Sequence, residues 1–200
     1  MKYLLFDIGN VLADFDEGHL LERVAGSTRF SREAVTARDH ELDDLVEKGL
    51  ISPMEYVERL NASKGLDWTR DRLTQVWSEV FTLNETGRAL FEEAVGAGIP
   101  VCMLSNIAEF HVEAIRRNWP GFFDGAQELF FSYRIGVRKP DPAIYRHVLQ
   151  TLNAEPGQCF FLDDLPENVD AACRLGMQAH RFFPEVADQL RAAAHAFMAG

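Results

Sequence analysis

The chain lacks the features typical of membrane-spanning, secreted and disulfide-rich proteins. No apolar run approaches the ~18 residues that a membrane-spanning helix requires. The N-terminal apolar run is too short for a signal peptide and is interrupted by Asp7, so we expect a cytoplasmic protein. Three cysteines, Cys102, Cys159 and Cys173, fall within apolar patterns without metal-ligand spacing. We interpret them as reduced residues of the core.

Basic residues are also scarce. Twenty Lys and Arg against 31 Asp and Glu give a formal net charge of −11 at pH 7. Nucleic acids and anionic membranes attract clustered Lys and Arg, so neither is an expected partner. A site for an anionic substrate would have to be locally positive. The sequence shows no internal repeat or low-complexity tract, and it leaves the oligomeric state open.

Polar side chains follow short apolar runs at several places along the chain. The runs at 3–6, 101–104 and 159–162 read as buried strands, because they are apolar throughout and are bounded by turn-forming or polar residues. In open α/β sheets, ligands bind at the carboxyl edge of the strands. The side chains that this places at one edge are, in chain order, Asp7, then Ser105 with Asn106, and finally Asp163 with Asp164. Lys139 precedes Pro140 and a new helical pattern in a fourth such segment.

Helical patterns separate these predicted strands. Apolar residues recur at helical spacing near 90–95, 108–115, 144–149 and 169–173, and a further strand is expected at 129–131. Strands that alternate with helices predict a parallel sheet. The fold class is therefore α/β, a Rossmann-like parallel sheet with flanking helices.

A long helical insertion interrupts this alternation after the first strand. The pattern is helical throughout 16–84, where Gly49 ends one helix, Ser52 begins the next, and a last helix carries the apolar residues from Leu73 to Phe81. We predict two domains, an α/β core formed by 1–15 and 85–200 and a small α-helical cap formed by 16–84.

The set of Asp7, Ser105, Lys139 and the Asp163–Asp164 pair resembles the haloacid dehalogenase-like (HAD) superfamily. Its four motifs are a nucleophilic Asp, a Ser or Thr, a Lys and an acidic pair, and the match extends over residues 6–171. The resemblance implies hydrolysis of a small phosphate ester through an aspartyl-phosphate on Asp7, with a cap that excludes water and selects the leaving group.

The resemblance also assigns a role to each residue. Asp7, Ser105 and Lys139 would be catalytic, and Ser105, Asn106 and Lys139 would bind the phosphate. Asp7, Asp163 and Asp164 would repel one another unless a divalent cation lay between them, and oxygen ligands of this kind suit Mg²⁺. The metal ligands would be Asp7, Asp163, Asp164 and the backbone carbonyl of Gly9. The spacing to Asn168 favours Asp164 as a direct ligand, with Asp163 as a second ligand or an outer partner.

Gly9 departs from the usual phosphatase pattern, which has a second Asp as general acid and base at this position. Such assistance is typically worth ~10²–10⁴-fold in rate, so its absence favours substrates with good leaving groups, such as a sugar 1-phosphate or an acyl phosphate. Asn10, Asp14, Asp16 or a water are the nearest substitutes. The Gly-Asn pair resembles a HAD subset that includes bacterial α-glucose-1-phosphate phosphatases. We therefore predict a Mg²⁺-dependent phosphatase acting on a small phosphorylated metabolite, in particular a sugar phosphate.

Other interpretations stay open. A 2-haloacid dehalogenase shares the fold and the Asp nucleophile, but its pattern has Tyr where this chain has Gly9 and lacks the paired acids. A noncatalytic phosphate-sensing or protein-binding domain would explain Gly9 as a loss. Ser105 and Asn106 could simply cap the following helix. The histidines, including His40, are assigned to the surface or the core, with a role in the cap as the alternative for His40 or Arg38. Arg138 is assigned to an exposed face, with the pocket as the alternative.

Overall fold

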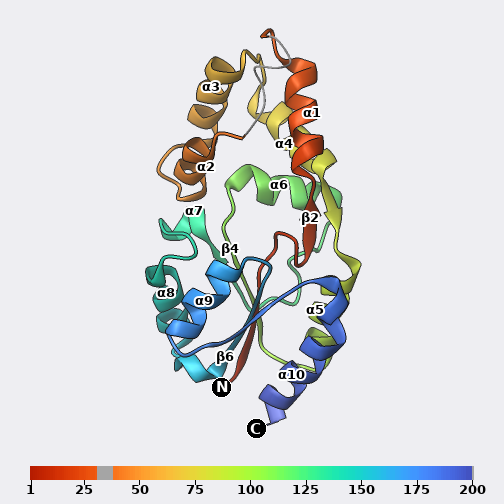
Figure 1. Ribbon diagram of the computed structural model, residues 1–200, viewed down its shortest axis with the longest axis vertical. Helices are drawn as coiled ribbons and strands as arrows, with labels where there is room; N and C mark the ends of the chain where they lie inside the picture. Colours follow the sequence, from red (N-terminus) through yellow and green to blue (C-terminus); the bar gives the residue numbers. More distant parts are fainter. Residues whose placement is uncertain (31–37, 200) are drawn as a thin grey trace.

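The computed structural model describes residues 1–30 and 38–199, and its centre is a five-stranded sheet (Figure 1). The strand order is β5-β4-β1-β6-β7, and every neighbouring pair is parallel. The strands are β1 (Tyr3–Phe6), β4 (Val101–Ser105), β5 (Glu128–Phe131), β6 (Cys159–Asp163) and β7 (Gln178–Arg181). The predicted α/β class with a parallel sheet is confirmed.

The central strand β1 is buried along its whole length, which explains its uninterrupted apolar sequence. Its side chains alternate between two hydrophobic clusters. Leu4 and Phe6 belong to the larger cluster, whereas Tyr3 and Leu5 belong to the smaller one on the opposite face. Both faces of the sheet are therefore covered, and its carboxyl edge is left as the place where side chains can meet a ligand.

The covering helices divide between the two faces. The smaller cluster takes its helical members from α8 (Pro142–Leu152) and α9 (Pro166–Arg174). The larger cluster includes residues of α5 (Glu85–Gly96), α6 (Glu109–Asn118) and α10 (Ala187–Ala199), and it continues into the helical insertion from Leu20 to Val80. Among the cysteines, Cys102 and Cys159 are buried and free as predicted. Cys173 is exposed, so its interpretation as a core residue was wrong; it lies on the outer side of α9.

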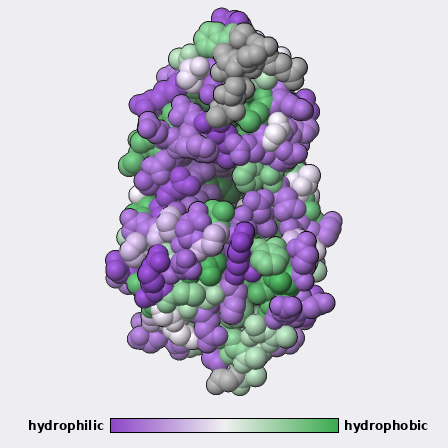
Figure 2. All heavy atoms as spheres, viewed as in Figure 1, coloured by the Kyte–Doolittle hydropathy of each residue, from purple (hydrophilic) through white to green (hydrophobic). Residues whose placement is uncertain are grey.

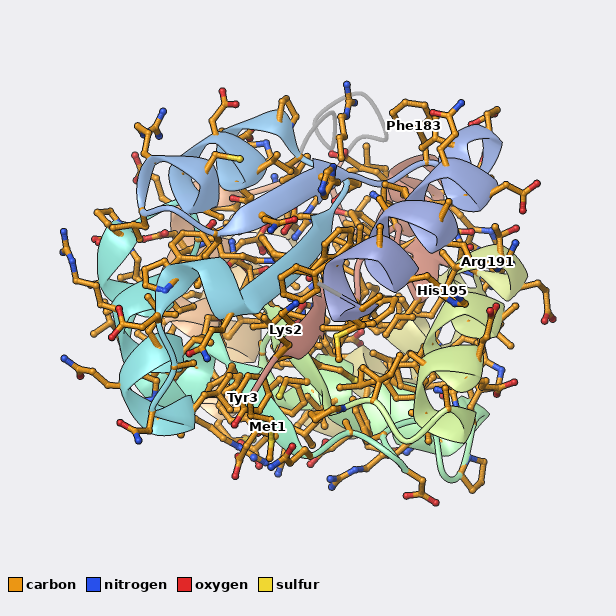
Figure 3. All side chains as sticks on the ribbon, turned by 90° about the horizontal axis from the view of Figure 1, so that it is seen from below. Met1, Lys2, Tyr3, Phe183, Arg191 and His195 are labelled. Carbon is orange, nitrogen blue, oxygen red and sulfur yellow. The ribbon has the colours of Figure 1, made fainter. Side chains whose placement is uncertain are left out.

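The two chain ends lie together at the end of the molecule opposite the helical cap (Figure 1). Seen from below, Lys2 lies beside α10, and Arg191 and His195 project from that helix toward α5 (Figure 3). The Lys2 ammonium lies 5.0 Å from the centre of the Phe197 ring, and Arg191 pairs with Glu93 of α5 at 2.8 Å. In the part of the chain that the structure describes, no helix is long and apolar enough to cross a membrane.

In residues 16–30 and 38–84 of the described chain, four helices form a separate layer above the carboxyl edge of the sheet (Figure 1). They are α1 (Glu17–Ser27), α2 (His40–Glu47), α3 (Pro53–Lys64) and α4 (Arg70–Val80). As predicted, Gly49 follows the end of α2 with a φ of 64°, and the Ser52 side chain accepts a hydrogen bond from the backbone N–H of Glu55 at the start of α3.

The prediction that the insertion is helical throughout was wrong. The last helix, α4, ends at Val80, and Phe81 begins β3 (Phe81–Leu83), which pairs antiparallel with β2 (Ala13–Phe15). The two strands carry the chain into and out of the helical layer, and pairing satisfies their backbone groups where the chain leaves the helices. This ribbon lies at both predicted domain boundaries. The division into 1–15 with 85–200 and 16–84 stays a prediction.

The helical layer contacts the sheet layer on two sides. α4 packs along α6, where the rings of Trp77 and His111 lie 4.0 Å apart. On the other side, the end of α2 approaches α7 (Ser132–Ile135) closely: a Cβ at Gly49 would lie 2.3 Å from the carbonyl oxygen of Tyr133. Only glycine fits there, because both the positive φ and the close approach exclude a side chain.

Candidate active site

The structure brings the polar side chains of all four predicted segments to the carboxyl edge of the sheet. Asp7 follows β1, Ser105 ends β4, and Asp163 ends β6 with Asp164 directly after it. Carboxylate oxygens of the three aspartates lie within 4.8 Å of one another. Lys139 comes from the loop between α7 and α8, and its ammonium lies 2.9 Å from Oδ1 of Asp7 and 2.6 Å from Oδ2 of Asp163.

Lys139 is buried, yet it has an acceptor for each of its three N–H groups. Besides Asp7 and Asp163, its Nζ donates to the carbonyl oxygen of Leu104 at 2.9 Å. Burial alone would lower the pKa of Lys139, but the charges of Asp163 and Asp7 outweigh burial and raise it. The ammonium therefore stays charged and forms a fixed positive centre beside Asp7.

The two members of the acidic pair have different surroundings. Both oxygens of Asp163 are used within the protein: Oδ2 accepts from Lys139, while Oδ1 accepts from the backbone N–H of Leu165 and from Nδ2 of Asn168, each at 2.9 Å. Asp164 is more exposed, lines the cleft and accepts from Nδ2 of Asn10 at 3.0 Å. This geometry fits the predicted roles of Asp164 as a direct metal ligand and of Asp163 as an outer partner, and both roles stay predictions.

Asn106 acts as a clamp on Lys139. Its Oδ1 accepts from the backbone N–H of Lys139 and its Nδ2 donates to the carbonyl oxygen of the same residue, both at 2.8 Å. Neither Ser105 nor Asn106 caps α6, because the residue at that N-cap is Ala108; the capping interpretation was wrong. Both residues line the cleft, and their predicted contacts with phosphate stay predictions.

The pKa of Asp7 is raised to about 7. Burial is the main cause; Lys139 opposes it, while Asp163 and Asp164 add to it. When all are ionised, the three carboxylates of Asp7, Asp163 and Asp164 outnumber the single ammonium of Lys139, so the cluster carries a net negative charge. A divalent cation held by oxygen atoms fits the three carboxylates, and Asp7, Asp163, Asp164 and the backbone carbonyl of Gly9 stay its predicted ligands.

A cleft of about 250 Å³ separates these residues from the helical cap. Figure 2 shows the surface hollowed between the upper, helical part and the lower part of the molecule. On the core side the cleft is lined by Asp7, Gly9, Asn10, Ser105, Asn106, Arg138, Lys139, Asp164, Leu165 and Asn168; on the other side it is lined by Phe15, Arg38, His40, Asp43 and Glu47. A substrate bound at Asp7 would therefore also contact the cap.

Several cleft residues were missed or assigned elsewhere at the level of sequence. For Arg138 an exposed face was favoured over the pocket, but Arg138 lines the cleft and pairs with Glu47 at 3.1 Å and with Asp44 at 3.3 Å. Arg38 also lines the cleft, where it pairs with Asp43 at 2.9 Å. The position of Arg138 next to Lys139 is the sequence signal that points to the pocket. Asp43 and Glu47 carry no such signal, since only the packing of α2 brings them to the site.

Comparison with known proteins identifies the family. A family model described as haloacid dehalogenase-like hydrolase matches residues 1–176. The chain is 28% identical over 180 residues to the sesquiterpene phosphatase astK of Aspergillus oryzae, covering 88% of this chain and 87% of that protein. It is 24% identical over 201 residues to the D-ribitol-5-phosphate phosphatase of Bacteroides thetaiotaomicron, covering 92% of each.

The fold is also similar to that of solved structures. A HAD family enzyme of Bacteroides thetaiotaomicron, crystallised with magnesium and inorganic phosphate, superposes with a TM-score of 0.79 at 22% identity, over 92% of this chain and 95% of that one. The resemblance to α-glucose-1-phosphate phosphatases stays a prediction. With the family model matching most of its length, the chain belongs to the haloacid dehalogenase-like hydrolases.

Proposed function

We propose that the protein is a Mg²⁺-dependent phosphatase that hydrolyses a small phosphorylated metabolite through an aspartyl-phosphate on Asp7. The observation that carries this proposal is the placement of the Asp7 carboxylate in a cleft, 2.9 Å from the ammonium of Lys139 and within 4.8 Å of the acidic pair. A nucleophile, a fixed cation and a set of oxygen ligands are what phosphoryl transfer to a carboxylate requires.

The residues of the chain divide the work as follows. An oxygen of Asp7 attacks phosphorus and the bond to the leaving oxygen breaks; water then attacks the aspartyl-phosphate, which releases phosphate and restores the carboxylate. Lys139 balances charge on the phosphate oxygens, and Ser105 donates a hydrogen bond to one of them. Mg²⁺, held by Asp7, Asp164 and the carbonyl of Gly9, would supply the further positive charge that allows two anions to approach.

The relatives support the reaction class, since two of them are phosphatases by name, one acting on a sesquiterpene compound and one on an alditol phosphate. A sugar phosphate is the substrate class that we favour, because the wall of the cleft opposite Asp7 is mostly polar: Arg38, His40, Asp43 and Glu47 stand there with one aromatic residue, Phe15.

The test is phosphate release from a panel of sugar phosphates and simple phosphate esters, measured with Mg²⁺ and again with EDTA. We expect turnover that depends on the metal and favours sugar 1-phosphates and other esters with good leaving groups. Turnover that is unchanged by EDTA would contradict the metal requirement. Halide release from a 2-haloacid, with no phosphate release, would instead identify a dehalogenase.

Gly9→Asp is expected to speed hydrolysis of substrates with poor leaving groups. A Cβ at Gly9 would have no neighbour within 4 Å, so the first atom of the new side chain meets no clash. If missing acid catalysis limits the rate, kcat for an alkyl phosphate should rise by at least ~10-fold, whereas p-nitrophenyl phosphate should change little. Gly9→Asn, which has the same size and cannot supply a proton, is the control. An equal change for both substrates, or for both variants, would refute this explanation.

A further inference from the structure

Among the described residues, no arginine that lines the cleft is unpaired. Arg38 and Arg138 both line the cleft, and each is paired with a carboxylate that also lines it, Asp43 and Glu47 respectively. A second phosphate or a carboxylate on the leaving group would find no free guanidinium there, and it would face two acidic side chains. The charges of this wall therefore disfavour a leaving group that is itself anionic.

In the first pair, Arg38 with Asp43, both carboxylate oxygens have hydrogen-bond donors. Nε and Nη2 of Arg38 approach the same oxygen of Asp43 at 3.0 and 2.9 Å, and the hydroxyl of Tyr56 donates to the other oxygen at 2.8 Å. The guanidinium also lies over the rings of Phe15 and Trp77, 5.8 and 5.5 Å from their centres. This network holds Arg38 rigidly and offers few unused groups to a ligand.

The second pair is incompletely satisfied. Glu47 is 8% exposed, and its buried Oε2 lies 3.1 Å from Nη2 of Arg138, yet it accepts no well-aligned hydrogen bond from a described residue. Nε of Arg138 is likewise buried without an acceptor. Buried polar atoms without partners are uncommon in proteins and are costly. Two cleft residues that pair with each other therefore carry one acceptor and one donor without a hydrogen-bond partner.

We propose that Glu47 and Arg138 are the specificity-determining pair for the leaving group and select a neutral, polyhydroxylated one such as an alditol or a sugar. A hydroxyl can donate to the carboxylate and accept from the guanidinium, and so can satisfy both groups at once. Since both atoms are shielded in this arrangement, a small reorientation of the two side chains toward the bound hydroxyl is part of the proposal. This inference rests on the proposed phosphatase function.

An apolar leaving group would gain nothing from this wall. A long isoprenoid chain would cover Glu47 and Arg138 without offering a hydrogen bond, and buried groups that are left unpaired discriminate strongly against such ligands. The proposal therefore separates this chain from its relative that acts on a sesquiterpene compound, and it places the chain with enzymes for hydroxylated substrates.

The experiment compares kcat/KM for ribitol 5-phosphate, propyl phosphate, fructose 1,6-bisphosphate and farnesyl phosphate in the wild type and two variants. Glu47→Gln keeps the size of the side chain and removes its charge. Asp44→Asn is the matched control, because Asp44 also pairs with Arg138 but does not line this cleft. The wild type should prefer ribitol 5-phosphate, and Glu47→Gln should lower its kcat/KM at least ~10-fold, mainly through KM, while propyl phosphate changes less than about twofold.

Several outcomes would overturn the inference. They are a wild-type preference for farnesyl phosphate or the bisphosphate, an equal loss for ribitol and propyl phosphates in Glu47→Gln, and an equal loss in Asp44→Asn. Failure of the proposed phosphatase function can be distinguished from failure of this inference. If the protein is not a phosphatase, even p-nitrophenyl phosphate will release no phosphate with Mg²⁺. In that case the Kd values of ribitol 5-phosphate and propyl phosphate for wild type and Glu47→Gln, measured by calorimetry, decide the role of the pair.

Discussion

Asp7→Asn is expected to lower kcat for phosphate release by on the order of 10⁴-fold or more, because the amide cannot act as the nucleophile. The fold should persist. An amide oxygen can still accept the hydrogen bond that the backbone N–H of Ile8 donates to Oδ1 of Asp7 at 2.7 Å, and Lys139 keeps its contacts with Asp163 and the carbonyl of Leu104. The measurement is single-turnover and steady-state release of phosphate with Mg²⁺, with the mass of the variant checked for deamidation.

The same substitution should stabilise the metal-free protein at high pH. The pKa of Asp7 is raised from 3.8 to about 7, so the folded chain binds a proton there more tightly than the unfolded chain does. The stability contributed by the protonated carboxyl is complete below the unfolded pKa and is lost as pH rises through about 7. An asparagine has no proton to lose. In EDTA, the Tm of Asp7→Asn should therefore exceed that of the wild type by several degrees at pH 8 and by much less at pH 5.

Asp164→Asn separates the role of nucleophile from that of metal ligand. It keeps Asp7 and Lys139 but removes a carboxylate that lines the cleft. We expect its activity to fall at low Mg²⁺ concentration and to recover as Mg²⁺ is raised, whereas Asp7→Asn should not recover.

Turnover by Asp7→Asn above the contaminating level, or a Tm difference between Asp7→Asn and the wild type that shrinks from pH 5 to pH 8, would contradict the assignment of Asp7.

The framework of the site could be predicted because it depends on short, buried strands. β1, β4 and β6 are buried along their whole length and apolar up to the polar residue that ends or follows each strand, so both the strands and their carboxyl ends are visible in the sequence. Parallel pairing then requires those ends to meet at one edge. Nothing more than local pattern and sheet geometry was needed to place Asp7 near Asp163.

The contacts that complete the site depend on packing between distant segments and left no local pattern. Asn106 clamps a residue 33 positions away, and the polar residues that follow a strand look the same whether they cap a helix or hold a loop. The placement of Glu47 depends on how α2 lies against α7, which includes the close approach of Gly49 to Tyr133. β3 was missed because a strand of three residues shows too little alternation to be distinguished from the end of a helix.

Lys139→Met should destabilise the protein more than any surface substitution. Removing one partner of a buried ionic group leaves the other uncompensated, which costs about 3–5 kcal/mol. Here the loss would leave Asp7 and Asp163 beside each other and beside Asp164, and the carbonyl oxygen of Leu104 would lose a donor. The free energy of unfolding, from urea denaturation in EDTA at pH 8, measures this cost. Activity should fall by at least ~10²-fold, since the fixed cation beside the nucleophile is gone.

Two further variants identify the cause of this loss. Lys48→Met is the control. The Lys48 ammonium pairs with the partly exposed Asp44 at 2.7 Å, and surface pairs of this kind contribute about 0–1 kcal/mol to stability. The double variant Lys139→Met with Asp163→Asn removes one of the uncompensated charges, so it should recover part of the stability of the single variant without its activity. A Lys139→Met protein as stable as Lys48→Met, or a double variant less stable than the single one, would contradict a charge origin. Because the same ammonium neutralises Asp163 and adjoins the nucleophile, its loss should affect folding and catalysis through one set of contacts.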